Sequence, residues 1–499
     1  MRSPLDWSRP RQLWLAIAVA ALLLLPLLGT GSLRNWDEGI YAACSCDMHA
    51  RGEWLTSSQQ GEFWPNKPPV YFILTRVIFY LCGVNEWAVR LPAALCGVAC
   101  VGLTFLLADA LWGGAAGLCA AAVLLSTQQF LFYATQGQLD VPLACFVILA
   151  LYAFWRGRAQ PRYFLLSGIA SALAFLTKQV LGWMAWPIII LFIAASGEWR
   201  HWWNRWMLAG VLVSVLLPAA WTGYEYHVYE AAHAIDANRL DGSQFLDAMY
   251  RHHVTQRLSA GVESSAKPWH YYLTDVMLKR NKAATGLAVL ALALLCVARS
   301  TGRLEFARPE WKLAGIALFG ILLFFMAAAS QAKWYLLPLY PVWAVAVGGV
   351  LSQYIGVYRR FDVFLALLVA LVGTTALSRQ MWDHDFNPGM RELAGELRAA
   401  TADEPSYYIF NPPETEPALG FYAYGLQGIV IRDANWEQAV AMLAGQIDRH
   451  PPGFRIMIVS RRAVWTRLQQ EALADRLTLR REYPARDPDE SLCLLEGKR

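Results

Sequence analysis

Long apolar segments recur along this chain, and basic residues cluster in alternate loops between them. A helix needs about 20 mostly apolar residues to cross a bilayer. Lipid offers no hydrogen bonds to a backbone, so a spanning segment must satisfy its own polar groups. Only 16% of the 499 residues are charged, whereas a soluble domain averages about 25%. The sequence therefore predicts a polytopic α-helical membrane protein.

The charged loops predict the topology. Short loops rich in Lys and Arg stay in the cytoplasm. An inner N-terminus places all five basic segments on that side, namely 2–11, 156–162, 197–206, 299–312 and 358–361. One missed pair of spans would preserve this agreement, so we expect about 11–13 spans. No basic run is typical of nucleic-acid binding. The eleven candidate spans are 13–30, 87–111, 114–131, 140–155, 162–178, 181–196, 205–222, 283–299, 312–329, 335–352 and 361–378.

The same topology places most of the polar segments outside the cytoplasm. They include a first external loop at 31–86, a large external loop at 223–282 and the tail. Residues 380–499 mix helix-like and strand-like stretches, which is typical of a small α/β domain. We therefore expect a transmembrane domain at 1–379, an extracytoplasmic α/β domain at 380–499, and a working face on the outer side.

Three charged residues of the first external loop are candidates for chemistry. Asp37 and Glu38 come directly after the first span, where a carboxylate can take a proton from an acceptor, although acids also begin helices. Lys67 lies in PNKPP, whose prolines oppose a helix start and favour a rigid turn. An ammonium held there suits a phosphate, although a lysine can also lie along the interface.

Further polar residues stand at the outer ends of later spans. Asp140 begins a span, where it can bind substrate or cap the helix. Lys178 ends a span, where its ammonium can reach the interface. Lys333 is followed by Trp334 and Tyr335, which also fit an aromatic belt.

Histidines gather in the large external loop, which holds five of the nine. None has the HExxH spacing of a zinc site, so a metal site stays open without being favoured. The five are His227, His233, His252, His253 and His270.

Taken in order, several motifs resemble bacterial relatives of the protein O-mannosyltransferases, and most closely the lipid A aminoarabinose transferase type. The resemblance covers most of residues 13–350 and is most specific from KPP to NEWAVRLP. The motifs are WDEGIYAACSCDMHARGEWL, NKPPVYFILTRVIFYLCGVNEWAVRLPAAL, QLDVPLACF, SGIASALAFLTKQ and AKWYLLPLYP.

The resemblance implies a GT-C fold in the bacterial inner membrane, with the active site and the C-terminal domain in the periplasm. Such enzymes move a sugar, with inversion, from a polyprenyl-phosphate donor to a lipid, glycan or protein acceptor. Membrane lipids surround the enzyme. The implied roles fall on the residues singled out above. They are Asp37 and Glu38 in catalysis, Lys67, Lys333 and Tyr335 at the donor phosphate, and Asp140, Lys178, His252, His253 and His270 toward the acceptor.

Departures from the family pattern concern a metal. Asn66 stands where these transferases usually have Glu, Ile40 where they usually have Arg, and GVESSAK precedes PWHYYL where they often have His and Arg. Because Glu and His are implicated as metal ligands there, no cofactor is certain and a divalent metal is doubted. No metal-ligating residue is assigned.

Two other classes of function compete with the enzyme. A transporter or flippase for lipid-linked sugars would place ionisable groups near the bilayer centre and show a repeated half. The spans here carry few charges, and the polar residues lie on one side. A scaffold with an outer binding domain would give the DE and KPP loops no role. We therefore favour the glycosyltransferase.

Overall fold

The structure is a computed structural model in which two compact units are described separately. It describes residues 7–256, 267–300, 307–355, 372–373 and 385–498, apart from 27, 35, 60, 402–405, 411–416, 432–434, 452–453 and 484–490. The predicted span 361–378 lies outside the described residues, except for 372–373.

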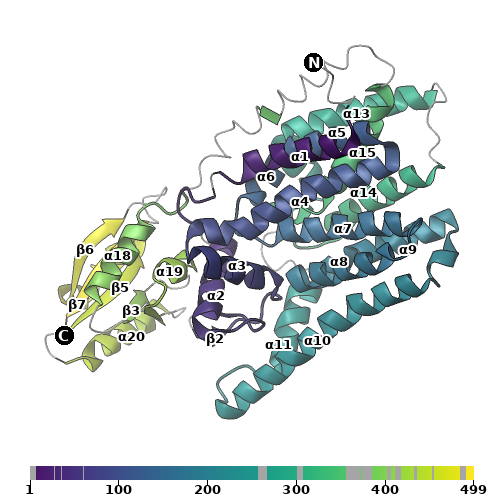
Figure 1. The fold of residues 1–499 in the computed structure, drawn as a ribbon. Coiled ribbons are helices and arrows are strands. Elements are labelled where there is room, and N and C mark those ends of the chain that lie inside the picture. Colours follow the sequence, from purple (N-terminus) through teal and green to yellow (C-terminus); the bar gives the residue numbers. More distant parts are fainter. Residues whose placement is uncertain are drawn as a thin grey trace. The chain divides into compact units, whose positions relative to one another are not determined.

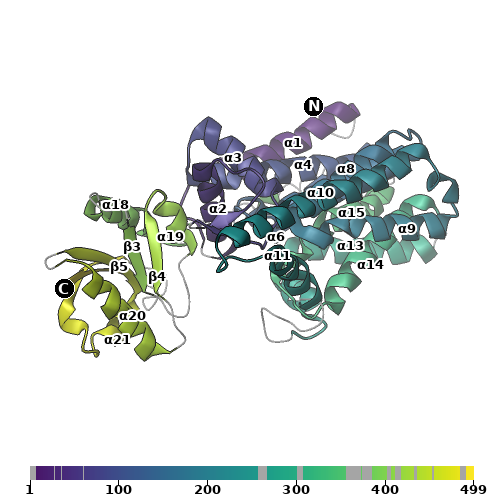
Figure 2. The same cartoon turned by 90° about the horizontal axis from the view of Figure 1, so that it is seen from below.

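The first unit, Met1–Leu28, Pro65–Thr75 and Arg90–Trp382, is helical. Its long helices lie side by side in both views (Figures 1 and 2). Five helical stretches in the described part of the chain are long and apolar enough to cross a membrane, or six if one bent pair counts as a span. The α-helices of this unit include α1 (Arg9–Leu24), α4 (Glu86–Trp112), α5 (Gly114–Leu125), α6 (Gln128–Ala134), α7 (Asp140–Gly157), α8 (Tyr163–Lys178), α9 (Ala185–Ser196), α10 (Arg205–Ile235), α13 (Lys282–Ser300), α14 (Pro309–Ala327) and α15 (Leu339–Ile355).

One apolar stretch, Tyr163–Ser196, holds two helices that fold back on each other. The ring of Phe164, at the start of α8, lies 5.6 Å from that of His201, just after α9. Arg158, before α8, pairs with Glu198 at 2.6 Å. The chain reverses in the short 3₁₀ helix Gln179–Met184. The two helices match the predicted spans 162–178 and 181–196.

Two helices differ from the sequence prediction. The segment 114–131 is not straight, since α5 and α6 meet at 73°. At the break, the hydroxyls of Ser126 and Thr127 bond to the carbonyl of Val123, and such bonds compete with the helical ladder.

Helix α10 continues through 223–235, residues predicted to begin the large external loop. The helix persists because one face stays buried, through Trp221, Glu225, Tyr229 and Ala232.

The second unit joins Gly29–Trp64 and Arg76–Val89 to Asp383–Arg499. Its five-stranded sheet has the order β4-β3-β5-β7-β6. The strands are β3 (Ser406–Phe410), β4 (Gln427–Ile431), β5 (Arg455–Arg461), β6 (Leu477–Tyr483) and β7 (Leu492–Lys498). Strands β3, β4 and β5 are parallel, and β6 and β7 are antiparallel to their neighbours. The predicted α/β character of the C-terminal residues is confirmed.

Both faces of this sheet are covered, because alternate side chains of a strand point to opposite faces. Tyr407 and Ile409 join one apolar core, and Tyr408 and Phe410 join the other. Helix α18 (Met390–Ala400) covers the first face, and α20 (Trp436–Arg449) and α21 (Arg462–Leu468) cover the second (Figure 2).

Residues of the first external loop complete one of these cores. Leu33, Ala42 and Cys46, the last two from helix α2 (Asp37–Arg51), are buried in the same cluster as Tyr407. Gly39 is required at this contact, since a Cβ there would come within 2.8 Å of the Ala418 backbone. Packing against the sheet therefore fixes the helix that begins at Asp37.

Candidate functional site

Asp37 is the first residue of α2, and its carboxylate is partly exposed. The residue before it, Trp36, has φ 69°, a region that a bulky side chain rarely adopts. The hydroxyl of Tyr41 donates to the Asp37 carboxylate at 3.3 Å. Backbone strain of this kind gathers at functional sites. The geometry therefore presents Asp37 as an oriented, partly exposed carboxylate.

Glu38 has a different environment from its neighbour. Its side chain is fully buried and accepts a hydrogen bond from the backbone N–H of Arg34 at 2.7 Å. That bond fixes the turn that precedes α2. We therefore favour Asp37 over Glu38 as the carboxylate that acts on a substrate, with Glu38 holding the turn.

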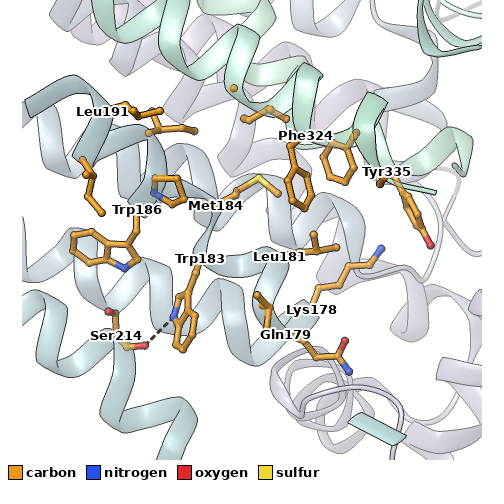
Figure 3. Close-up of a pocket in the computed structure, with 18 of the residues that line it drawn as sticks. Lys178, Gln179, Leu181, Trp183, Met184, Trp186, Leu191, Ser214, Phe324 and Tyr335 are labelled. Carbon is orange, nitrogen blue, oxygen red and sulfur yellow. Dashed lines mark hydrogen bonds between the residues drawn. The ribbon is translucent and has the colours of Figure 1, made fainter. Parts of the chain in front are cut away.

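A large cavity of about 710 Å³ lies in the first unit, between α8, α9, α10 and α14. Its lining is mostly apolar, with Trp183, Trp186 and Phe324 among the largest side chains. Lys67, Lys178, Gln179 and Tyr335 supply polar atoms to the lining. Figure 3 shows Lys178, Gln179 and Tyr335 toward one end and Trp186 and Leu191 toward the other. The cavity is therefore amphipathic, with the Lys178 ammonium at one end.

Lys178 is held by two contacts at this end. Its ammonium donates to the carboxylate of Asp140 at 2.5 Å, and both side chains are almost entirely buried. The same nitrogen lies 5.2 Å from the centre of the Tyr335 ring, within the range of a cation–π contact. The structure thus brings together three of the residues singled out in the sequence. Asp140 pairs with Lys178 and makes no cap, since no side chain caps this helix start.

Lys67 is buried and lines the same cavity. It precedes Pro68 and Pro69, and helix α3 (Val70–Cys82) begins directly after them. The side-chain amide of Gln179 donates to the Asn66 carbonyl at 2.9 Å. This bond ties the Lys67 turn to the end of α8.

Gln179 is a site residue that the sequence analysis did not single out. It has φ 57°, and with Trp36 it is one of two non-glycine residues with positive φ in the described part of the chain. The strained backbone turns the chain at the end of α8. Its position directly after Lys178 was the only signal in the sequence.

The remaining predicted site residues do not line this cavity, or their side chains are outside the described part of the structure. Lys333 begins the 3₁₀ helix Lys333–Leu336 and is half-buried, but only Tyr335 of that helix lines the cavity. His270 is exposed, with its Nδ1 3.2 Å from the hydroxyl of Thr274. His252 and His253 belong to the π-helix Asp247–Gln256, and their side chains lie outside the description.

The residues at this site do not fit a divalent metal. Position 66 offers a neutral amide where a carboxylate would be needed, and its backbone oxygen already accepts from Gln179. Within the described ranges, no three His, Cys, Asp or Glu side chains converge as metal ligands.

Comparison with known proteins agrees with this geometry. Residues 66–224 match the family described as dolichyl-phosphate-mannose-protein mannosyltransferase. The chain is 26% identical to an undecaprenyl phosphate-α-4-amino-4-deoxy-L-arabinose arabinosyl transferase of Pseudomonas fluorescens, over 74% of this chain and 65% of that protein. A transferase of the same name from Edwardsiella ictaluri is 27% identical, over 73% and 64%. The matches thus span slightly less than two thirds of these relatives.

Solved structures share the fold over nearly the whole chain. ArnT from Cupriavidus metallidurans bound to undecaprenyl phosphate superimposes with a TM-score of 0.71 over 97% of both chains, at 18% identity. The Archaeoglobus fulgidus oligosaccharyltransferase gives 0.59 over 91% of this chain and 70% of that one, at 13% identity. The predicted fold class is confirmed. The named relatives are glycosyltransferases, the class of enzyme that the sequence predicts. In sequence and fold, the chain is therefore similar to the GT-C glycosyltransferases of the lipid A aminoarabinose transferase type.

Proposed function

We propose that this protein transfers a sugar from a polyprenyl-phosphate carrier to a lipid acceptor on the periplasmic face of the bacterial inner membrane. The observation that carries the proposal is the cavity, which Lys67 helps to line, with Lys178 and Tyr335 toward one end and apolar side chains over most of the rest (Figure 3). A polyprenyl phosphate has the same division, an anionic head on an apolar chain. Pockets of this size are typical of small-molecule sites.

Lys67 is the residue to which we assign the donor phosphate. Lys67 lines the cavity, and the resemblance implies that the lysine of the KPP motif lies at the donor phosphate. The amide of Gln179 fixes the turn that carries Lys67. A positive charge close to the phosphate stabilises the anion that develops as the sugar leaves, and this lowers the barrier.

The reaction is a single inverting displacement. The acceptor oxygen attacks the anomeric carbon of the sugar from the face opposite the phosphate. The bond between that carbon and the phosphate oxygen breaks, and the phosphate keeps the electron pair. The acceptor proton passes to the carboxylate of Asp37, which acts as general base. One carboxylate suffices, because the leaving phosphate needs no proton.

Asp140 and Lys178 complete the proposal as a buried pair that shapes the cavity toward the acceptor. The names of the relatives give an undecaprenyl-phosphate donor and an aminoarabinose sugar. A lipid acceptor is favoured by the resemblance of the sequence motifs to the lipid A aminoarabinose transferases. A transporter or flippase for lipid-linked sugars is the other candidate. It is not favoured by the family match, whose members are transferases.

The test is transfer by the purified full chain in detergent. The protein is incubated with defined polyprenyl-phosphate sugars and a lipid A-type acceptor, and mass spectrometry follows the released carrier and the glycosylated product. We expect both to appear together with wild-type protein and not with Asp37→Asn. Lys279→Ala is the control, since this exposed lysine pairs with Asp275 at 2.6 Å and does not line the cavity. Flipping of intact donor in proteoliposomes without carrier release would refute the transferase.

A further inference from the structure

Arg76 is a buried arginine of the second unit, and no carboxylate among the described residues neutralises its charge. It lies on helix α3, and its side chain is fully inaccessible to solvent. No acidic side chain in the described part of the chain lies within ion-pair distance of it, and its Nε and Nη1 have no hydrogen-bond partner there. Its Nη2 donates to the hydroxyl of Tyr80 at 3.1 Å. Such burial is costly unless a charge partner is supplied.

Aromatic rings enclose this guanidinium. Its central carbon lies 4.0 Å from the centre of the Trp54 ring and 5.8 Å from that of Tyr80. The two rings are themselves stacked, 5.8 Å apart. Cation–π contacts of this kind offset part of the desolvation of an arginine, but they satisfy none of its N–H groups. The aromatic enclosure therefore leaves the hydrogen-bonding demand unmet.

His49 lies near the Arg76 guanidinium and supplies no negative charge to it. Its ring lies 4.6 Å from that of Tyr80, and its Nδ1 has no partner within the described residues. Burial and the nearby Arg76 charge both lower the pKa of His49, so at neutral pH the ring is uncharged. A neutral imidazole can still donate or accept one hydrogen bond beside an anion.

The surface around Arg76 indicates where an anion would come from. Trp54 and Tyr80 are 41% and 58% exposed, and Val77 and Leu81, on the same helix as Tyr80, are 44% and 78% exposed. Exposed Trp and Tyr among apolar side chains are typical of the membrane–water boundary. Lipid phosphates lie at that depth. Arginine suits phosphate because its planar guanidinium presents several donors at once.

We propose that Arg76 is the anchor of a phosphate-binding site, with Trp54, Tyr80 and His49 as its walls. The phosphate belongs to a lipid headgroup at the membrane boundary or is free inorganic phosphate. Because the unpartnered nitrogens are closed to solvent, Trp54 must move to admit the anion. The site uses none of the residues assigned to sugar transfer, so it stands whether or not that assignment holds.

The experiment measures retention of lipid by the purified full chain with native mass spectrometry. Dioleoyl phosphatidate is compared with dioleoylglycerol, which has the same tails and no phosphate. We expect wild type to retain phosphatidate selectively, and Arg76→Met to lose this preference by roughly tenfold or more, as expected for a lost charge-assisted hydrogen bond. Arg51→Met is the control, because Arg51 is an exposed arginine of the same unit whose guanidinium donates to the Gly61 carbonyl.

A second arm separates the two sources of phosphate. Melting temperature is measured with inorganic phosphate and with chloride at equal ionic strength. A phosphate-specific rise that needs Arg76, without selective lipid retention, assigns the site to free phosphate. Equal lipid retention in wild type and Arg76→Met, with no Arg76-dependent phosphate effect, overturns the proposal. If Arg76→Met does not fold, the wild-type protein decides. The proposal is then overturned if wild type shows no preference for phosphatidate and no stabilisation by phosphate.

Discussion

The buried ion pair between Asp140 and Lys178 supports a quantitative prediction about stability. The two groups are 2.5 Å apart, and their side chains are 5% and 7% exposed. The perturbation is a double-mutant cycle of Asp140→Leu, Lys178→Met and the two together. Each single change leaves one buried charge without its partner, whereas the double change removes both charges.

The magnitude follows from the burial of both groups. Removing one partner of a buried pair costs about 3–5 kcal/mol, because the remaining charge is no longer compensated. Replacing both partners with apolar side chains of similar volume is often neutral. The loss of Asp140 from the first turn of α7 adds roughly 0.3–1 kcal/mol through the helix dipole. We therefore expect the double variant to be more stable than either single variant.

The assay is unfolding of the detergent-solubilised full chain in sodium dodecyl sulfate, followed by circular dichroism. The reasoning is refuted if the double variant loses as much free energy of unfolding as the two single variants added together. That result would mean that the pair is not energetically coupled. Transfer activity is measured on the same samples. A double variant that is stable but inactive would support the proposed role of these residues at the acceptor side of the cavity.

Other predictions address the remaining parts of the site. Asp37→Asn should abolish transfer while donor binding persists, because an amide cannot take the acceptor proton; near wild-type turnover would remove Asp37 as the base. Lys67→Ala should weaken donor binding by roughly 1.5–3 kcal/mol, the worth of a charge-assisted hydrogen bond, and unchanged retention of polyprenyl phosphate would contradict this. Gln179→Leu should raise the KM for donor more than it lowers kcat, because the Lys67 turn loses its anchor; an effect on kcat alone would argue against it. A reporter active only outside the cytoplasm, fused after residue 499, should be active, and activity of a cytoplasmic reporter there would reverse the topology.

The sequence alone determined the membrane class and most helix positions. Apolar length is a local property, so α4, α13 and α14 lie close to the predicted spans 87–111, 283–299 and 312–329. It also identified Asp37, Lys67, Asp140 and Lys178 as a group by motif. It missed the bend at Ser126 and the length of α10, because both depend on hydrogen bonds and buried faces that hydropathy does not encode.

Only the tertiary structure decided which polar residues meet. Asp140 and Lys178 are 38 positions apart and both had adequate local explanations, as a helix cap and an interfacial lysine. Folding places them 2.5 Å apart because α7 and α8 pack against each other. Likewise, the burial of Arg76 without an acidic partner among the described residues cannot be read from FILTRVIFYL, a mostly apolar run. Burial and pairing depend on what the rest of the chain places around a residue, and this is set by long-range packing rather than by neighbours in the sequence.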